Sequence, residues 1–355
     1  MVAVATCLLL ASCAQTGPPL PPSLELPRPP SDLRATRKGN TVTLSWSQPQ
    51  LTTDRQSVRY LGPTRICRSA ASEMKECGNP ASETPAPAGR ASRQQQRVTR
   101  TATDTLPVAL EDQNPTGDIT YAVEVLNGDR RSAGLSNLVR VPAAPTLPAP
   151  QDLDAELTDD GVSLTWAALA QSANIAGVKH RYRIYRREEG SGKDAVAGEV
   201  PLGDAGPVRD LDSSFEWEKT YLYRITVVSV VAREKGEVQV EGNDSQSLRV
   251  IAHDVFPPSV PTGLQAVASG EGQKTFVDLI WAPVTNSDLA GYNVYRGESG
   301  EAATKLNTEL VKSPAYRDGT AERGKTYSYS VSAVDVRGNE SAKSEEAGET
   351  VPASN

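Results

Sequence analysis

The sequence predicts an all-β protein built from three consecutive copies of one unit. Its 355 residues include 27 glycines and 26 prolines, whereas aromatic residues make up only 5%. This composition favours small β domains with many turns and thin cores. A short motif, Pro-x-x-Leu-x-Ala, begins at Pro30, Pro150 and Pro261. In each copy it is followed by a segment of alternating apolar residues that ends in tryptophan.

The first twelve residues are small and apolar and run directly into Cys13. Leu10 to Cys13 resembles the bacterial lipobox, in which a signal peptide is removed before a cysteine that receives a lipid. The stretch has no Lys or Arg before its apolar part, which secretory signals normally have. We therefore predict a lipoprotein signal peptide over residues 1–12 and lipidation of Cys13. The alternative is a conventional signal peptide or a truncated apolar leader, with Cys13 incidental.

Residues 13–29 form a proline-rich linker. Proline fixes φ and removes backbone donors, so this segment is expected to be an extended, polyproline II-like stalk. The stalk would hold the first domain away from a membrane.

The three segments that end in tryptophan predict equivalent β-strands. Apolar residues alternate with polar ones, which places one strand face on a core and the other toward water. The segments are Val42 to Trp46, Val162 to Trp166 and Val277 to Trp281.

Two further patterns recur downstream of these strands. Tyr182 to Arg186 matches Tyr292 to Arg296, and the first copy has Thr64 to Arg68 with Cys67 in place of a tyrosine. Later in each copy a tyrosine follows an aspartate after nine residues; the pairs are Asp112 and Tyr121, Asp212 and Tyr221, and Asp318 and Tyr327.

These motifs resemble the fibronectin type III family, and the resemblance covers Pro30 to Val351. It implies three tandem immunoglobulin-like (fibronectin type III-like) β-sandwiches, at residues 30–142, 150–253 and 257–351, after the signal peptide and the stalk. It also implies that the strand-B tryptophan packs against a strand-F tyrosine. Tyrosine corners, in which a hydroxyl bonds back to the backbone, are implied at Tyr121, Tyr221 and Tyr327. On this interpretation the repeated tryptophans and tyrosines are structural.

The first unit contains a long insertion between Arg68 and Leu106 that is poor in apolar residues. Such a segment buries too little surface to order itself, so the simplest interpretation is a mobile loop. The functional alternative is a basic contact site for an anionic polymer or an acidic partner. Its candidate residues are Arg90, Arg93, Arg97 and Arg100.

Only two cysteines, Cys67 and Cys77, remain if the signal peptide is removed and Cys13 is lipidated. An even pair in an exported protein favours a disulfide over free thiols. The link would fix the start of the insertion to its strand. A zinc site is disfavoured because only two of the four ligands are present.

One aromatic residue, Trp217, lies outside the repeated pattern, four residues before Tyr221. It is either an additional cap on the sandwich edge or an exposed ring that stacks on a sugar. Both remain open from the sequence.

The sequence predicts no catalytic site, no metal site and no cofactor. The two histidines, His180 and His253, lie far apart and lack the neighbours that metal or nucleophilic chemistry requires. A weaker possibility is calcium binding by acidic clusters at the second unit, which lack the spacing of a known calcium loop; these are Asp152, Asp154, Glu156, Asp159 and Asp160.

The formal net charge of -7 is modest, and the N-terminal third of the chain is mildly basic. Nucleic-acid binding would need a denser basic face. Beyond the N-terminus no apolar run reaches the roughly 18 residues of a spanning helix.

We therefore expect a non-enzymatic cell-envelope lipoprotein that acts as an adhesion, scaffold or protein-interaction array. It would be attached to the outer membrane or the cell surface through a lipid anchor. Its expected partners are other envelope proteins or polysaccharide, and no nucleic acid. The alternative is a carbohydrate-binding or accessory subunit of an extracellular polysaccharide-degrading or envelope assembly.

Overall fold

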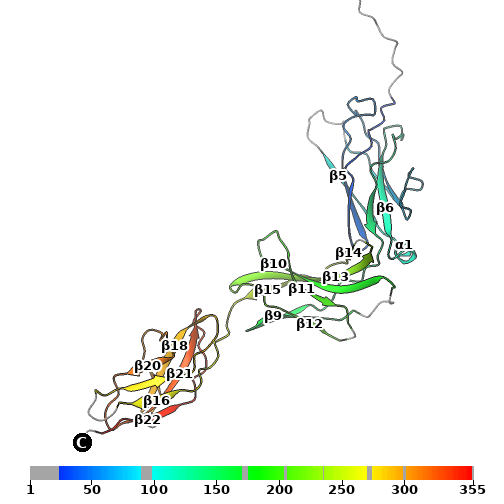
Figure 1. The fold of residues 1–355 in the computed structure, drawn as a ribbon. Coiled ribbons are helices and arrows are strands. Elements are labelled where there is room, and N and C mark those ends of the chain that lie inside the picture. The colour runs from blue at the N-terminus through cyan, green and yellow to red at the C-terminus, as the bar shows by residue number, and fades with distance from the viewer. Residues whose placement is uncertain are drawn as a thin grey trace, which may run out of the picture.

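A computed structural model of the chain describes residues 24–88, 98–169, 175–203, 206–234, 236–269, 274–298 and 301–353. Its regular structure is almost entirely β-strand, with one short helix, α1 (Val108–Gln113). The strands form three sandwiches that follow one another along the chain (Figure 1). This arrangement confirms the predicted all-β fold class of three tandem immunoglobulin-like sandwiches.

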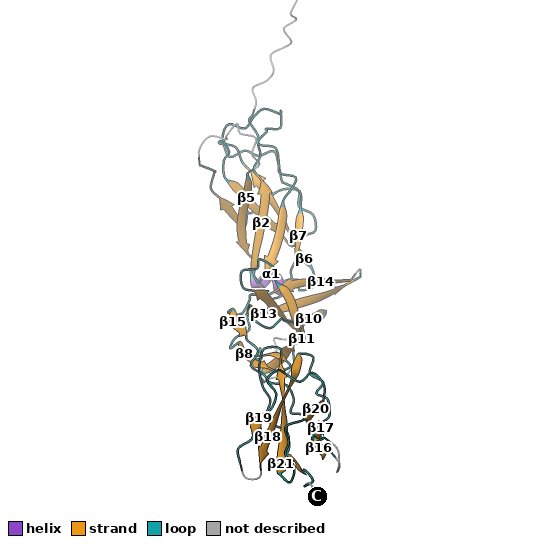
Figure 2. Cartoon of the chain, turned by 90° about the vertical axis from the view of Figure 1, so that its left-hand side faces the viewer, coloured by secondary structure: helices purple, strands orange, loops and turns teal. Residues whose placement is uncertain are grey.

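The first sandwich packs the sheet β1-β2-β5 against the sheet β4-β3-β6-β7. Its strands are β1 (Arg34–Lys38), β2 (Thr41–Ser47), β3 (Thr64–Ser69), β4 (Ser82–Thr84), β5 (Thr99–Thr105), β6 (Asp118–Val125) and β7 (Val139–Pro142). Helix α1 connects β5 to β6 and lies at the end of this sandwich that faces the second one (Figures 1 and 2). β4 and β5 lie inside the segment predicted to be a mobile insertion, so that prediction was wrong for residues 82–84 and 99–105.

The second sandwich contains an additional strand. Its strands are β8 (Asp154–Thr158), β9 (Gly161–Trp166), β10 (Val178–Glu188), β11 (Ala195–Pro201), β12 (Val208–Asp212), β13 (Lys219–Arg233), β14 (Gly236–Glu241) and β15 (Leu248–Ala252). The first half of β13 pairs with β15, and its second half pairs with β14. The 15-residue β13 therefore extends beyond its own sandwich as one arm of a hairpin.

The third sandwich packs the sheet β16-β17-β20 against the sheet β19-β18-β21-β22. Its strands are β16 (Gln265–Ala268), β17 (Val277–Ile280), β18 (Leu289–Glu298), β19 (Thr304–Lys305), β20 (Ala315–Asp318), β21 (Thr326–Asp335) and β22 (Ala347–Thr350).

Each sandwich encloses its own cluster of buried apolar side chains, and each cluster contains the repeated tryptophan. The Trp166 ring meets Tyr182 of β10 edge-on at a centroid distance of 5.3 Å, and Trp281 meets Tyr292 of β18 at 5.2 Å. These tyrosines lie on the third strand of each sandwich. The predicted strand-F partners, Tyr221 and Tyr327, lie in the same buried clusters as Trp166 and Trp281. The edge-on contacts to Tyr182 and Tyr292 were not predicted.

Two of the three predicted tyrosine corners are confirmed. The Tyr221 hydroxyl accepts a hydrogen bond from the Glu216 amide at 3.0 Å and donates to the Glu216 carbonyl at 3.1 Å. The Tyr327 hydroxyl accepts from the Glu322 amide at 3.1 Å. Each hydroxyl thus ties the start of strand F to the turn before it.

The predicted corner at Tyr121 is wrong. Strand pairing places Tyr121 opposite Arg68, whereas the residues opposite Arg186 and Arg296 are Tyr223 and Tyr329. Tyr121 is therefore equivalent to the second tyrosine of the later copies, not to the corner tyrosine. The first unit has Ile119 at the corner position.

The equivalent aspartate of the first unit is Asp104, not Asp112. Tyr121 donates a hydrogen bond to Asp104 at 2.7 Å, as Tyr223 donates to Asp212 at 2.8 Å and Tyr329 to Asp318 at 2.9 Å. Asp112 lies exposed on α1. Because α1 lengthens the connection between β5 and β6, counting residues back from the tyrosine selected the wrong carboxylate.

Candidate functional site

The predicted disulfide is confirmed. The Sγ atoms of Cys67 and Cys77 are bonded at 2.00 Å, with Cα atoms 5.1 Å apart. Cys67 is fully buried on β3, at the position that Tyr185 and Tyr295 occupy in the other two sandwiches. The bond therefore joins the segment after β3 back to that strand.

Most of the predicted basic contact lies outside the described residues, as does Cys13. Of the four arginines, Arg90, Arg93 and Arg97 fall in this category. Arg100 is half-buried on β5, opposite Trp46 of β2. A ligand contact by this group stays a prediction.

Trp217 is half-buried where the second sandwich meets the third. Its ring packs edge-on against Phe215 at a centroid distance of 4.7 Å and lies 5.9 Å from the ring of Phe256 in the following linker. Trp217 also packs against the core of the second sandwich. Its surroundings match the interpretation as a cap, whereas sugar stacking by this ring stays a prediction.

Polar contacts accompany the aromatic ones at this second junction. Arg337, after β21, forms ion pairs with Asp254 at 3.2 Å and with Glu218 at 3.4 Å. Glu218 also accepts a hydrogen bond from the Asp254 amide and lies 2.8 Å from Nδ1 of His253. The hydrogen bond to His253 is the main reason that the Glu218 pKa is lowered. The linker residue Asp254 is thus bound by Glu218 of the second sandwich and by Arg337 of the third.

The carboxylates that gather near this junction are not those considered from the sequence. Within the described ranges, the group that satisfies the geometry for a metal site comprises Asp254, Asp288 and Asp335, whose ligand atoms lie within 4.8 Å of one another. These residues are 34 and 47 positions apart, so local spacing gave no signal. Hydrogen bonds from the amides of Arg337 and Asn339, together with the Asn339 side chain, hold Asp335 in place.

The junction between the first and second sandwiches joins their sheets. Lys38 of β1 pairs in parallel with Glu241 of β14, and the Gly39 amide donates to the Glu241 carbonyl at 2.7 Å. The Lys38 ammonium also binds the Asp244 carboxylate at 2.7 Å. Gly39 has φ +56°, and a Cβ there would lie 2.6 Å from the Asn243 side chain. Glycine adopts this left-handed conformation without steric cost and lets the Asn243 side chain approach closely.

A small separate core fills the space beneath this contact. Ala144 of the linker is fully buried with residues of β10, β13 and β14, namely Val178, Val231 and Val240. Arg233, at the end of β13, reaches the first sandwich and binds Asp118 at 2.9 Å and the Gly117 carbonyl at 3.1 Å. The hairpin formed by β13 and β14 therefore packs on the linker and binds the first residue of β6.

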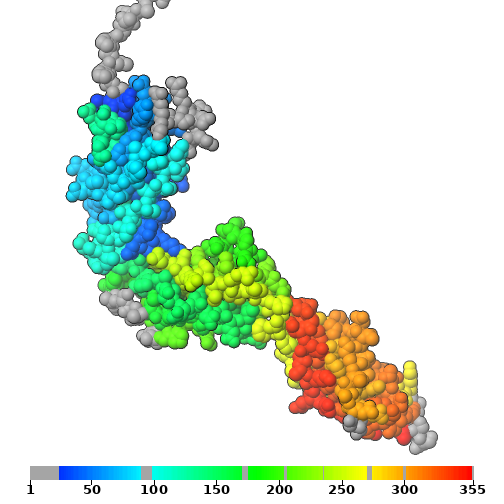
Figure 3. Space-filling view, turned by 180° about the vertical axis from the view of Figure 1, so that it is seen from behind, coloured from blue at the N-terminus to red at the C-terminus, as the bar shows by residue number. Residues whose placement is uncertain are grey.

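Figures 1 and 3 show the consequence of this arrangement. The first sandwich stands at an angle to the second, so the molecule bends at the first junction. Strand pairing and ion pairs cross this junction, and an apolar cluster fixes the linker to the second sandwich. The bend is therefore built into the structure.

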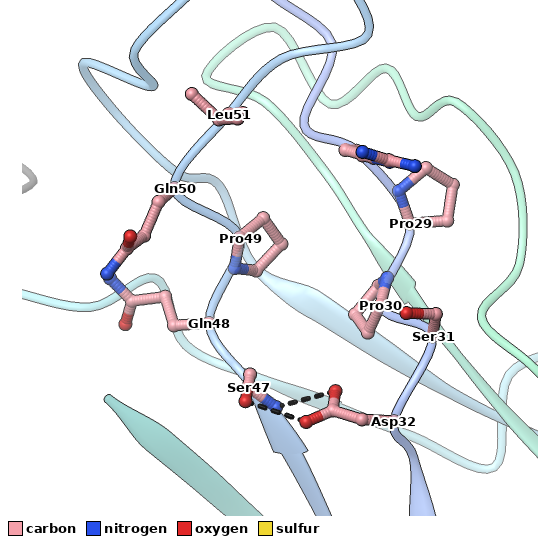
Figure 4. Close-up of a pocket in the computed structure, with 10 residues that line it drawn as sticks. Pro29, Pro30, Ser31, Asp32, Ser47, Gln48, Pro49, Gln50 and Leu51 are labelled. Carbon is pink, nitrogen blue, oxygen red and sulfur yellow. Dashed lines mark hydrogen bonds between the residues drawn. The ribbon is translucent and has the colours of Figure 1, made fainter. Parts of the chain in front are cut away.

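A shallow groove of about 460 Å³ lies at the far end of the first sandwich (Figure 4). One wall is the segment before β1, residues 28–32, and the other is the segment after β2, residues 48–51. Asp32 closes the floor by accepting hydrogen bonds from the Ser47 amide and hydroxyl. Half of the lining residues are proline or glutamine.

The two histidines lie at different junctions of the chain. His253 contacts Glu218, as above, and His180 bonds to the backbone of Pro145 in the first linker. Burial lowers the pKa of His180, which favours its neutral form. Among the described helices, none is long and apolar enough to cross a membrane.

Comparison with known proteins gives short stretches of sequence similarity. No family model matches the chain. A stretch of 204 residues, 57% of this chain, is 30% identical to Exoglucanase B of Cellulomonas fimi, of which it covers 16%. A stretch of 241 residues, 67% of the chain, is 24% identical to the Titin homolog of Caenorhabditis elegans, of which it covers 1%. The chain therefore spans only a small part of the length of either relative.

Two solved structures of fibronectin domains are also similar to this chain. The crystal structure of chicken CNTN1 FN1–FN3 domains is 15% identical, covers 92% of this chain and 100% of its own, and has a TM-score of 0.28. An Fn3-like protein from Clostridium thermocellum is 35% identical over 27% of this chain and 96% of its own, with a TM-score of 0.24.

Proposed function

We propose that the chain is a non-enzymatic, lipid-anchored protein of the cell envelope whose sandwiches form a bent interaction array. In this role the array holds its outer surfaces at a fixed angle and distance from the membrane, where other envelope proteins bind them. The anchor would be the lipid on Cys13, followed by the proline-rich stalk.

The observation that carries this proposal is the construction of the first junction. Domains that are connected only by a linker are expected to move relative to one another. Here strand pairing of Lys38 with Glu241 and the Arg233–Asp118 ion pair cross the junction, and a buried apolar cluster fixes the linker to the second sandwich. A fixed angle is the property that a spacer or scaffold needs.

Small-angle X-ray scattering of the mature chain tests the fixed angle. The wild-type profile is expected to fit a single bent shape. The double variant Lys38→Ala, Arg233→Ala removes the ion pairs that cross the junction and is expected to give a broader distribution of intramolecular distances. Arg249→Ala is the matched control, because its pair with Glu189 is exposed within the second sandwich. A wild-type profile that needs several shapes contradicts the proposal.

Metabolic labelling with a fatty acid tests the anchor separately. The wild-type protein should carry the label and sediment with membranes, and the Cys13→Ala variant should lose both properties. Equal release of the two proteins into the medium would rule out lipidation.

A second function is favoured by the similarity to Exoglucanase B. The name of that relative describes an enzyme that acts on glucan, and the matching stretch of this chain is composed of sandwiches. We propose, as this second function, that the chain assists an extracellular polysaccharide-degrading or envelope assembly by binding carbohydrate. Retention of the purified chain on insoluble glucan, absent with an unrelated β-sandwich protein, is the expected result.

A further inference from the structure

Seven exposed threonines cover the outer face of the β1-β2-β5 sheet in the first sandwich. They alternate along the strands with side chains that point into the core, so they point to solvent. The seven are Thr36 on β1, Thr41 and Thr43 on β2, and Thr99, Thr101, Thr103 and Thr105 on β5.

Strand pairing aligns these threonines in rows that cross the sheet. Thr36 lies opposite Thr43, and Thr43 lies opposite Thr103 on its other side. The next row pairs Thr41 with Thr105. Neighbouring strands lie about 4.8 Å apart, and side chains on one face of a strand repeat about every 6.7 Å. The hydroxyls therefore form a regular grid.

Within the described part of the chain, these threonine hydroxyls form no hydrogen bond to another protein group. Each can donate one hydrogen bond and accept two. The threonine side chain is branched at Cβ and stiff at χ1, so a ligand that binds it freezes little additional motion. The face is thus arranged for hydrogen bonding before any ligand arrives.

The fold itself does not require threonine at these positions. On the equivalent face of the third sandwich, Asp278 and Arg317 form an ion pair at 2.6 Å. On that of the second sandwich, Thr165 lies between Asp154 and Arg209. In the first sandwich the charged outward side chains, Arg34 and Lys38, both lie on β1.

We propose that this threonine face binds a neutral polysaccharide. Sugar hydroxyls exchange hydrogen bonds with the row Thr36, Thr43 and Thr103, and the threonine methyl groups pack against the C–H groups of the sugar ring. The row Thr36, Thr43 and Thr103 contains no charged side chain. Its hydroxyls lose less on leaving water than charged groups would. Each contact is weak, but a polymer that repeats the same hydroxyls engages several rows at once. The inference rests on the second function proposed above and assigns its surface.

The test measures depletion of the full mature chain by microcrystalline cellulose and its retardation in gels that contain laminarin or polygalacturonate. Thr36→Val, Thr43→Val, Thr103→Val removes three hydroxyls at nearly constant shape. The matched control, Thr304→Val, Thr326→Val, Thr350→Val, makes the same change on exposed strand positions of the third sandwich. The first variant is expected to bind neutral glucan at least five-fold more weakly, whereas the control binds as the wild type does.

Serine at the same three positions keeps the hydroxyls and is expected to restore at least half of the binding, which separates hydrogen bonding from misfolding. Retention on glucan that is equal in the valine variant and the wild type would overturn the threonine face and leave the second function standing. If the wild type binds neither cellulose nor laminarin, the threonine face and the second function both fail.

Sedimentation velocity tests whether a second copy occupies the face. A wild type that is dimeric, with a valine variant that is monomeric, would overturn the polysaccharide assignment. Stronger binding to polygalacturonate than to laminarin would also overturn it.

Discussion

The hydroxyl of Tyr121 donates a hydrogen bond to the carboxylate of Asp104, across a gap of 17 residues in the sequence. Arg68 of β3, the strand that pairs with β6, binds the same carboxylate oxygen at 2.5 Å. The other sandwiches repeat this arrangement, with Arg186, Asp212 and Tyr223 in the second and Arg296, Asp318 and Tyr329 in the third. Each buried carboxylate thus links three strands, which are β3, β5 and β6 in the first sandwich, β10, β12 and β13 in the second, and β18, β20 and β21 in the third.

The Asp104→Ala variant is expected to lower the free energy of unfolding of the first sandwich by about 3 kcal/mol, because it leaves the Arg68 charge without its buried partner. Asp112→Ala is the matched control and should change it by less than about 0.5 kcal/mol, since Asp112 is exposed. Hydrogen exchange of β3 and β6 peptides in the full chain measures both. Similar effects of the two substitutions would contradict the assignment of Asp104.

The stability of the first sandwich is expected to fall as pH rises from about 4 to 7. Glu111 is buried against Arg37 at 2.6 Å, and desolvation raises its pKa to about 7. The unfolded value is about 4.3, so the folded state holds this proton more tightly. The resulting stabilisation is present below the unfolded pKa and is lost as pH approaches the folded one. The Glu111→Gln variant should unfold with a weaker dependence on pH in this range, as denaturant titrations at pH 5 and pH 8 would show.

The repeated motifs were sufficient to predict the sandwiches because the alternation of apolar and polar residues is a local property of each strand. Alternation such as that from Val162 to Trp166 fixes which side chains enter the core, and the structure buries Val162, Leu164 and Trp166 as expected. The disulfide was predictable for a similar reason, since both cysteines lie in one short segment.

The contacts between units could not be predicted in the same way. The run from Val227 to Val231 carries valines on both strand faces, interrupted only by Ser229, which indicates burial but does not identify the partner. That partner includes Ala144, more than 80 residues away. The threonine face was also missed, because alternating threonines are typical of any solvated strand until strand pairing places β5 beside β2.

Reduction of the disulfide is expected to loosen only the first sandwich. A loop this short contributes about 2.7 kcal/mol in the chain-entropy model. The Cys67→Ser, Cys77→Ser variant should therefore show faster hydrogen exchange in residues 64–84 and unchanged exchange in the other two sandwiches. Faster exchange across the whole chain would mean that the bond supports more than its own loop.

Replacement of Trp217 by alanine is expected to loosen the second junction without weakening glucan binding. The ring fills the space between Phe215 and Phe256, so its removal leaves a cavity where the linker meets the second sandwich. Limited proteolysis should then cut residues 253–260 several-fold faster than in the wild type. Trp217→Phe keeps an aromatic ring in place and is the matched control, expected to resist cleavage nearly as well.

The two roles considered for Trp217 predict opposite outcomes in this experiment. A structural cap affects the linker and leaves retention on cellulose unchanged, because the threonine face lies on the first sandwich. If the ring instead stacks on sugar, the Trp217→Ala variant should resist protease as the wild type does and should be retained less on cellulose. Such stacking uses an open ring face, whereas Trp217 is partly enclosed by two other aromatic rings and by the core beneath it. Faster cleavage with unchanged retention is therefore the expected result.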